Sequence, residues 1–132
     1  MSEENVEIVL EYLRLAEAND LEGIAALMHP EITATAVPGW PEPGPFVGRD
    51  AALAETKRLT DWGENRFTDI DVVADEGDWV VVASRWHVRG AGSGIATHFD
   101  VAVAVRVKEG RVIEWHNRWS RDEALEAAGL SE

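Results

Sequence analysis

The sequence has no cysteine, and its 12 basic residues are outnumbered by 25 acidic ones. Without cysteine the chain can form neither a disulfide framework nor a thiol nucleophile. The net charge of −13 repels nucleic acid and anionic membranes, so we expect neither as a partner. No uninterrupted apolar run approaches the ~20 residues of a membrane-spanning helix. The first residues also lack the basic start and apolar stretch of a signal peptide. We therefore expect a cytoplasmic protein.

Apolar and aromatic residues are plentiful in this chain. They make up 45% of its 132 residues and include six Trp and three Phe. A chain of this length can bury a substantial core, and large aromatic side chains are costly to leave in water. There is no internal repeat, linker or low-complexity stretch. The sequence therefore predicts one domain over residues 1–132.

Helical spacing of apolar residues predicts three helices in the first half of the chain, over residues 4–18, 21–28 and 49–62. Asp20 is expected to cap the second helix. A β-rich stretch at 32–37 predicts a strand between the second and third helices. Residues 38–48 hold four of the five prolines and are expected to form an ordered loop.

The second half predicts four strands, over residues 66–74, 79–89, 96–108 and 111–119. The turns between them are expected at 76–78, 90–94 and 109–110. Ser120 should cap a last short helix over 121–128, which Gly129 should end. Helices segregated from an antiparallel meander predict an α+β fold, in which a curved antiparallel sheet wraps around the three N-terminal helices.

Alternation along the strands identifies the face that should look inward. This face is apolar, with Ser84 and Asn117 as polar exceptions. The remaining inward side chains in the second, third and fourth strands are Val80, Val82, Trp86, Val88, Thr97, Phe99, Val101, Val103, Val105, Val107, Ile113, Trp115 and Trp119. Two interpretations of the polar pair stay open. Ser84 and Asn117 either form hydrogen bonds inside the core or point into a cavity and meet a ligand.

The opposite face of the strands is charged. It carries Arg85, His87, Arg89, His98, Asp100, Arg106, Glu114, His116 and Arg118, together with Ala102 and Ala104. Cross-strand ion pairs on a solvated face explain this pattern better than a catalytic cluster does. The face could also be an oligomer interface. No tight ligand spacing supports a metal site, and we expect none.

Several short motifs in a fixed order resemble the SnoaL-like branch of the nuclear transport factor two-like superfamily. They span essentially the whole chain and read YLRLAEANDLEGIAALMHPEI, FVGRDAAL, GDWVVV, KEGRVIEW and SRDEALEAAGL. The resemblance implies a cone of curved antiparallel sheet that encloses helices, with a pocket at its wide end. It also implies a homodimer formed through the outer sheet face. The family includes ketosteroid isomerases, limonene epoxide hydrolases, polyketide cyclases and binding proteins, so the fold leaves the function open.

Compared residue by residue with the family, this sequence lacks the catalytic groups of the best-known enzymes that it resembles. Tyr12 matches the oxygen-holding tyrosine of the isomerases, but Ala36 and Val103 stand where their two acids should be. In the epoxide hydrolase pattern, non-acidic residues again replace the catalytic carboxylates. Asn117 stands where one Asp should be, Ser84 and Trp86 replace the Arg and the other Asp, and Ala34 and Ala36 replace the water-holding pair. An amide cannot act as a general acid or base. In addition, no Asp or Glu lies on the inward face of the last three strands.

These observations predict an apolar pocket with neutral hydrogen-bonding groups. Tyr12 and Asn117 are the candidate catalytic residues. The candidate substrate-binding residues are Trp40, Phe46, Trp62, Ser84, Trp86, Phe99, Trp115 and Trp119. Trp40 and Phe46 would form a lid from the proline-rich loop. No cofactor is expected.

Three functions remain open. The first is an isomerase-, cyclase- or hydrolase-like enzyme acting on a hydrophobic cyclic substrate such as a polyketide, terpenoid or steroid. Tyr12 and Asn117 would then polarise a substrate oxygen. The second is a non-catalytic binding or carrier module, which the missing inward carboxylates favour. The third is a structural, oligomer-forming domain whose interior is filled by tryptophan.

Overall fold

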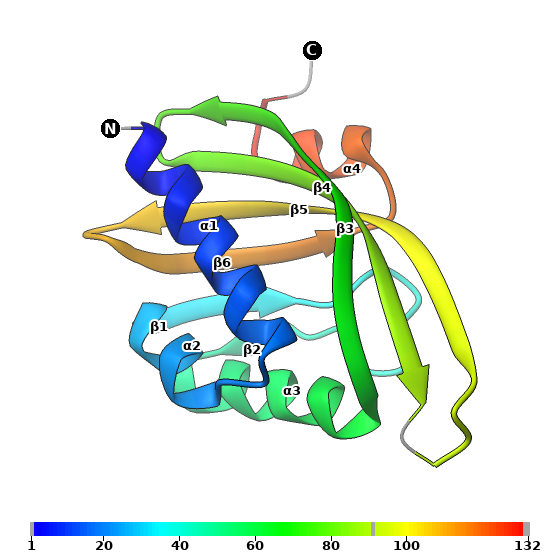
Figure 1. Ribbon diagram of the computed structural model, residues 1–132. Coiled ribbons are helices and arrows are strands. Elements are labelled where there is room, and N and C mark those ends of the chain that lie inside the picture. The colour runs from blue at the N-terminus through cyan, green and yellow to red at the C-terminus, as the bar shows by residue number, and fades with distance from the viewer. Residues whose placement is uncertain (1, 91, 131–132) are drawn as a thin grey trace.

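The computed structural model describes residues 2–90 and 92–130 (Figure 1). Ala91, in the expected turn 90–94, lies outside the described residues. The elements along the chain are α1 (Ser2–Glu17), α2 (Leu21–Leu27), β1 (Met28–Thr35), β2 (Phe46–Val47), α3 (Arg49–Trp62), β3 (Gly63–Glu76), β4 (Trp79–Gly90), β5 (Ala96–Lys108), β6 (Arg111–Arg118) and α4 (Arg121–Ala127). The predicted helices and the four-stranded meander are confirmed, with ends shifted by up to three residues.

One six-stranded sheet runs through the molecule in the order β2-β1-β6-β5-β4-β3. Neighbouring strands from β3 to β6 pair antiparallel, as predicted, but β1 pairs parallel with β6. The sheet is therefore mixed. β1 begins at Met28, where a helix end was expected, and it contains Pro30. The strand tolerates this proline because its ladder with β6 is interrupted between Met28 and Thr33.

The predicted helix caps are present. The carboxylate of Asp20 accepts a hydrogen bond of 2.9 Å from the backbone N–H of Gly23 at the start of α2. The hydroxyl of Ser120 accepts one of 3.2 Å from the N–H of Glu123 in α4. Gly129, the second residue after α4, adopts a φ of +73°, a conformation that costs glycine less than any other residue. These local signals set the ends of both short helices.

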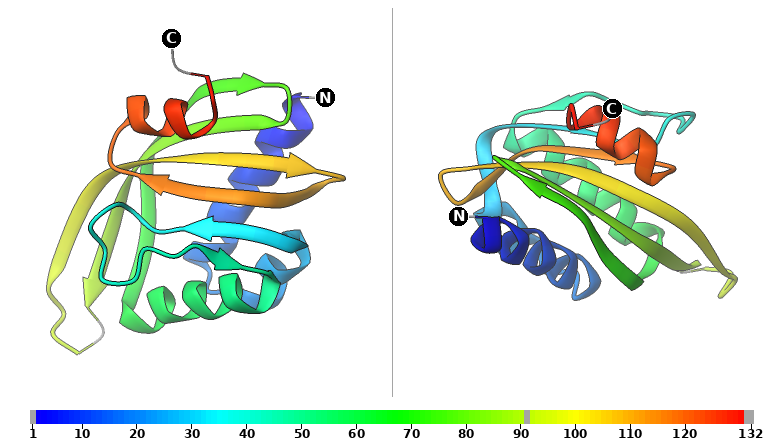
Figure 2. Two further views of the ribbon diagram at one scale, coloured as in Figure 1. Left: turned by 180° about the vertical axis from the view of Figure 1, so that it is seen from behind. Right: turned by 90° about the horizontal axis from the view of Figure 1, so that it is seen from above.

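The sheet curves around its helices and leaves one helix on its other side. α1 crosses the concave face, and α4 lies on the opposite, convex face (Figures 1 and 2). The main core lies between the concave face and the first three helices. Its fully or nearly fully buried members include Val9, Ile24, Ile32, Val80, Val82, Val105 and Val112. Within residues 2–90 and 92–130, no helix is long and apolar enough to cross a membrane.

A second, smaller core lies under α4 and corrects one expectation. Ala102 and Ala104, which alternation assigns to the charged outer face, are 1% and 0% exposed. They pack with Val81 and Ala83 against Ala124 of α4 and against Ala128, the residue that follows α4. Small side chains on the strands allow a helix to approach the sheet closely. The outer face is therefore partly a helix-packing surface.

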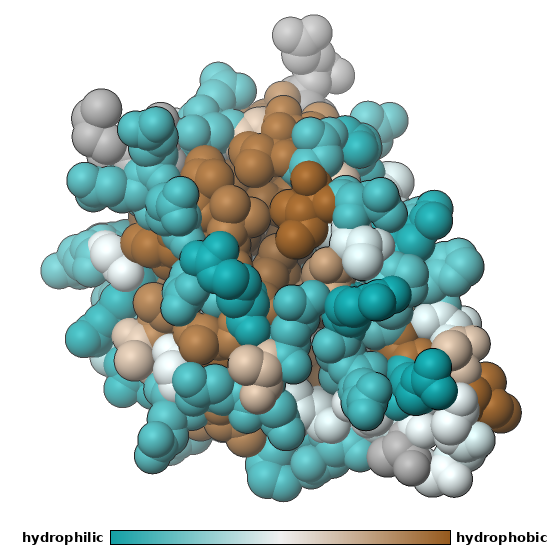
Figure 3. Space-filling view, in the orientation of Figure 1, coloured by the Kyte–Doolittle hydropathy of each residue, from teal (hydrophilic) through white to brown (hydrophobic). Residues whose placement is uncertain are grey.

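A bulge changes the side-chain alternation in β6. The pairing of β5 with β6 shifts between Arg106 and Val107. As a result Val112 is fully buried in the main core, although alternation predicts that Ile113 faces inward. The surface in the view of Figure 3 is mostly polar, with apolar side chains gathered in its upper part, over the region of α1 and the β3–β4 hairpin.

Candidate functional site

A cavity of about 140 Å³ lies between α1, α3 and the concave face of the sheet. Its walls come from every part of the fold except α2 and α4. The lining residues are Tyr12, Leu13, Ala16, Ala34, Thr35, Ala36, Val37, Trp40, Phe46, Ala52, Glu55, Thr56, Leu59, Thr60, Asn65, Phe67, Ser84, Trp86, Val101, Val103, Trp115 and Asn117. Most of this surface is aliphatic or aromatic, and the polar groups are few.

Tyr12 is buried in the wall contributed by α1. Its ring stacks on Trp115 with centroids 4.2 Å apart. Burial raises the pKa of Tyr12 to about 12, although a hydrogen bond with the Thr56 side chain partly opposes this effect. The phenol therefore keeps its proton at physiological pH and can serve as a hydrogen-bond donor.

Glu55 is the one carboxylate among the lining residues. It is 8% exposed, and neither carboxylate oxygen accepts a hydrogen bond from any described residue. Arg58, one helical turn further on, places a guanidinium nitrogen 3.1 Å from Oε1. Burial raises the pKa of Glu55, Arg58 lowers it, and the nearby Glu42 raises it further. A buried carboxyl group in this state is a typical general acid or base.

Asn117 lines the cavity but its side chain already has partners. Its Nδ2 donates to the backbone carbonyl of Thr35 over 3.0 Å, and its Oδ1 accepts from the indole nitrogen of Trp115 over 3.4 Å. Ser84 also lines the cavity, and its hydroxyl forms no hydrogen bond with another described residue. Of the two polar exceptions in the sheet, Ser84 thus has more of its hydrogen-bonding capacity free, whereas Asn117 keeps one unused amide proton.

The predicted site residues separate into two groups. Seven of the ten line the cavity, namely Tyr12, Trp40, Phe46, Ser84, Trp86, Trp115 and Asn117. The other three lie outside its lining, at its rim, namely Trp62, Phe99 and Trp119. Together with Trp40 and Trp86 they form a chain of neighbouring rings. Trp62 meets Trp40 edge-on at 5.3 Å, Phe99 lies 5.5 Å from Trp86, and Trp119 lies 6.1 Å from Phe99. Trp62 and Trp119 are 52% and 37% exposed.

The proline-rich loop closes one side of the cavity with Trp40. Several contacts fix the position of this loop. The indole of Trp119 donates to the carbonyl of Pro38 over 2.8 Å, and the N–H of Ala36 donates to the carbonyl of Pro43 over 2.9 Å. Glu42 forms an ion pair with Arg58 of α3. The loop is therefore attached to β6, to itself and to the helix that carries Glu55.

Comparisons with known proteins agree with this architecture. The family model for the SnoaL-like domain matches residues 9–115. This chain belongs to the SnoaL-like family. No curated protein sequence matches it significantly.

Solved structures share the fold of this SnoaL-like protein at low sequence identity. A nuclear transport factor two-like protein from Burkholderia xenovorans is 24% identical, with a TM-score of 0.75 and 97% of each chain covered. A predicted polyketide cyclase from Xanthomonas campestris is 18% identical, with a TM-score of 0.77, covering 92% of this chain and 94% of that one. An epoxide hydrolase of the limonene type from Mycobacterium tuberculosis is 13% identical, with a TM-score of 0.76, covering 96% and 90%.

Within the SnoaL-like fold, the positions that resemblance assigns to catalytic acids do reach the cavity, but they hold no acid. Ala36, Val103, Trp86 and Asn117 all line it. The carboxylate of this cavity instead comes from α3. The position of the ionisable group thus differs from both patterns considered in the sequence.

Sequence reasoning missed several lining residues, among them Glu55, Thr56, Asn65 and Phe67. The search for an inward acid considered the strands alone. Helical spacing within α3 contains the missing signal, because Ala52, Glu55, Thr56 and Leu59 recur at intervals of three and four residues and therefore share one face. Asn65 accepts a hydrogen bond of 2.7 Å from the indole of Trp86 and so fixes that ring.

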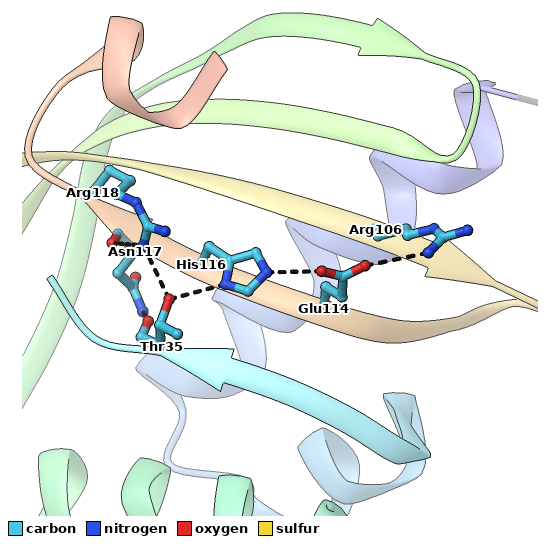
Figure 4. Close-up of polar contacts among 6 residues, drawn as sticks. All are labelled: Thr35, Arg106, Glu114, His116, Asn117 and Arg118. Carbon is cyan, nitrogen blue, oxygen red and sulfur yellow. Dashed lines mark hydrogen bonds and ion pairs between the residues drawn. The ribbon is translucent and has the colours of Figure 1, made fainter. Parts of the chain in front are cut away.

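The charged outer face contains a continuous hydrogen-bond network, shown in Figure 4. Arg118 donates to the Thr35 hydroxyl over 3.0 Å, and that hydroxyl lies 2.9 Å from Nδ1 of His116. Nε2 of His116 lies 2.9 Å from Glu114, which also accepts from Arg106 over 3.3 Å. The network joins β1, β6 and β5. Among the described residues, no group of three His, Asp or Glu side chains could hold a metal ion.

Replacing Thr35 with valine is expected to destabilise the fold by about 1–2 kcal/mol, because His116 and Arg118 each lose one hydrogen-bond partner in a half-buried position. Urea unfolding measures the effect. Thr33→Val is the matched control, since Thr33 lies two residues earlier on the same face of β1 and its side chain bonds no other described residue. Equal effects from the two variants would contradict a structural role for the network.

Proposed function

We propose that this protein is an enzyme that moves a proton on a small apolar cyclic substrate, with Glu55 as the acid–base group. The observation that carries the proposal is a buried carboxyl group without a hydrogen-bond partner, facing an aromatic cavity. Burying such a group costs free energy. Perturbed carboxyl groups in clefts are typical of catalytic sites.

The proposed reaction takes place next to a carbonyl group. The Glu55 carboxylate accepts a proton from the carbon beside the carbonyl, and the electron pair of that C–H bond moves onto the carbonyl oxygen to form an enolate. The Tyr12 hydroxyl donates a hydrogen bond to this oxygen. The carboxylic acid then returns the proton to the same carbon or, in a conjugated system, to another. No redox partner is required. Asn117 acts through Trp115, whose indole it holds against Tyr12.

Similarity in fold to a predicted polyketide cyclase supports this class of chemistry, since ring closure of a polyketide also begins with an enolate. The alternative is a non-catalytic carrier with the same apolar cavity. Deuterium exchange distinguishes the two. Cyclic ketones incubated with the protein in D₂O are followed by ¹H NMR, and the enzyme is expected to accelerate loss of the signals beside the carbonyl. A ligand that binds without any exchange above background would favour the carrier.

Tyr12→Phe is expected to slow this exchange by about 10–10²-fold, because one donor to the enolate is lost while the ring and its stack on Trp115 remain. The measurement is the exchange rate at saturating ketone. Binding of the unreacted ketone should change much less than the rate. An unchanged rate would remove Tyr12 from the mechanism.

A further inference from the structure

We infer that the cavity selects an uncharged substrate of single-ring size, and that Trp40 sets this size limit. The inference rests on the proposed function, since it names the substrate of the same site. It narrows the substrates expected from sequence, which include polycyclic polyketides and steroids.

The volume of the cavity supports the size limit. At about 140 Å³ it matches engineered apolar cavities of about 150 Å³, which take up a single benzene ring. A tetracyclic skeleton has several times the volume of one ring. It cannot lie wholly inside the cavity unless a wall moves outward.

Trp40 is the wall element best placed to set the limit. It lies on the loop between β1 and β2, whereas the other lining tryptophans, Trp86 and Trp115, lie on central strands and are 9% and 8% exposed. Its ring is wedged between Trp62 at 5.3 Å and Trp86 at 6.2 Å. An indole held between two others closes this side of the cavity with a rigid surface. Removing it leaves a space next to the existing cavity while the sheet stays in place.

The charges around the cavity favour a neutral ligand. The described lining includes no Lys, Arg or His, so an anion would find no countercharge there and would also enter a protein of net charge −13. A cation could approach Glu55, but Arg58 already lies 3.1 Å from its Oε1. A second positive charge would meet that guanidinium, and its own desolvation would oppose binding.

The polar groups in the wall suit one oxygen atom. Tyr12 donates a hydrogen bond, and the Ser84 hydroxyl, unused by the described residues, can donate another. Apart from Glu55, the other polar side chains of the lining already have hydrogen-bond partners within the protein, namely Thr35, Thr56, Thr60, Asn65 and Asn117. The remaining wall is apolar. The substrate class that fits is therefore a monocyclic ketone or enone.

Binding rather than turnover tests the inference, in the Glu55→Gln background, where the proposed chemistry is absent. The ¹H–¹⁵N signals of the tryptophan indoles are followed during titration with 2-cyclohexenone, with a bicyclic decalone and with a tetracyclic steroid enone. Cyclohexylammonium and cyclohexanecarboxylate provide charged single-ring probes. They do not undergo the proposed chemistry, so they are titrated, beside 2-cyclohexenone, against the protein with Glu55 in place. The same titrations are carried out on Trp40→Ala, on Trp40→Phe, which keeps an aromatic ring, and on Trp62→Ala, which removes a rim indole outside the cavity lining.

The expected result is that the monocyclic enone binds at least about tenfold more tightly than the steroid and than either charged probe. Trp40→Ala should bring the steroid within about threefold of the monocyclic enone, whereas Trp40→Phe should keep the original preference. Trp62→Ala removes one of the two indoles that hold Trp40, so it should reduce the preference less than Trp40→Ala does. Steroid binding equal to that of the monocyclic enone in the Trp40-containing protein would overturn the size limit. Tighter binding of cyclohexylammonium would overturn the neutral class. The size and charge preference can hold even if no ketone exchanges deuterium, so the two proposals fail separately.

Discussion

Glu55→Gln is expected to abolish proton transfer and, at the same time, to stabilise the folded protein at neutral pH. Loss of a general acid–base group lowers the rate by about 10²–10⁴-fold. Stability should rise by up to about 1 kcal/mol, because the amide has the same shape as the carboxyl group and removes a buried charge that lacks a hydrogen bond. The gain is small because the amide also has no partner there and because Arg58 loses its ion pair.

The pH dependence of this gain follows from the direction of the pKa shift. Burial raises the pKa of Glu55 above its ordinary value of 4.5, so the folded state favours the protonated form. Below the unfolded pKa both states hold the proton, and the variant gains little. As the pH rises the unfolded state ionises first, and the folded protein loses stability until its own pKa is passed. The difference between Glu55→Gln and the unmodified protein should therefore appear above pH 4.5 and level off at higher pH.

Urea unfolding at several pH values and the deuterium exchange rate measure the two effects. Asp61→Asn is the control, since Asp61 lies on the same helix, is exposed and pairs with Lys57 at the surface. Its effect on stability should stay within about 0.5 kcal/mol, and the exchange rate should not change. If Glu55→Gln keeps the exchange rate, the proposed mechanism is wrong. If it loses stability at neutral pH, the carboxylate has a structural role instead.

Glu55 also shows where sequence reasoning was incomplete. Alternation along β4, β5 and β6 placed Ser84, Trp86, Trp115 and Asn117 on the concave face correctly, because regular strands expose every second side chain to the same side. The same rule found no acid there. The acid lies on a helix, whose inward face follows a period of 3.6 residues. Alternation with a period of two therefore does not detect it.

Other differences between the sequence-based expectations and the structure arise from features that cannot be inferred from a single sequence. Alternation selects a face of the sheet but says nothing of depth, so Phe99 faces the concave side yet lies beyond the cavity, at its rim. Bulges shift the alternation by one residue, as at Val112. The cover that α4 provides over Ala102 and Ala104 depends on where the chain turns after β6. Small residues in the centre of an outer face were the available hint of such a cover.

Trp115 and Trp119 share one inward parity, four positions apart, and are expected to differ strongly in their contribution to stability. Trp115→Ala should cost about 3–5 kcal/mol, because Trp115 is 8% exposed, belongs to the main core and stacks on Tyr12. Trp119 is 37% exposed, and its main specific contact is the hydrogen bond to Pro38. Trp119→Ala should therefore cost about 1 kcal/mol.

Urea unfolding of the two variants measures this difference directly. If Trp115→Ala does not fold, Trp115→Phe provides a milder test, since phenylalanine keeps a ring against Tyr12 but loses the indole N–H that donates to Asn117. Trp115→Phe should still cost more than Trp119→Phe. Equal costs at the two positions would mean that the wall between Tyr12 and Asn117 is not part of the stable core. The position of the Tyr12 hydroxyl, and with it that of the ligand oxygen that it holds, depends on that wall.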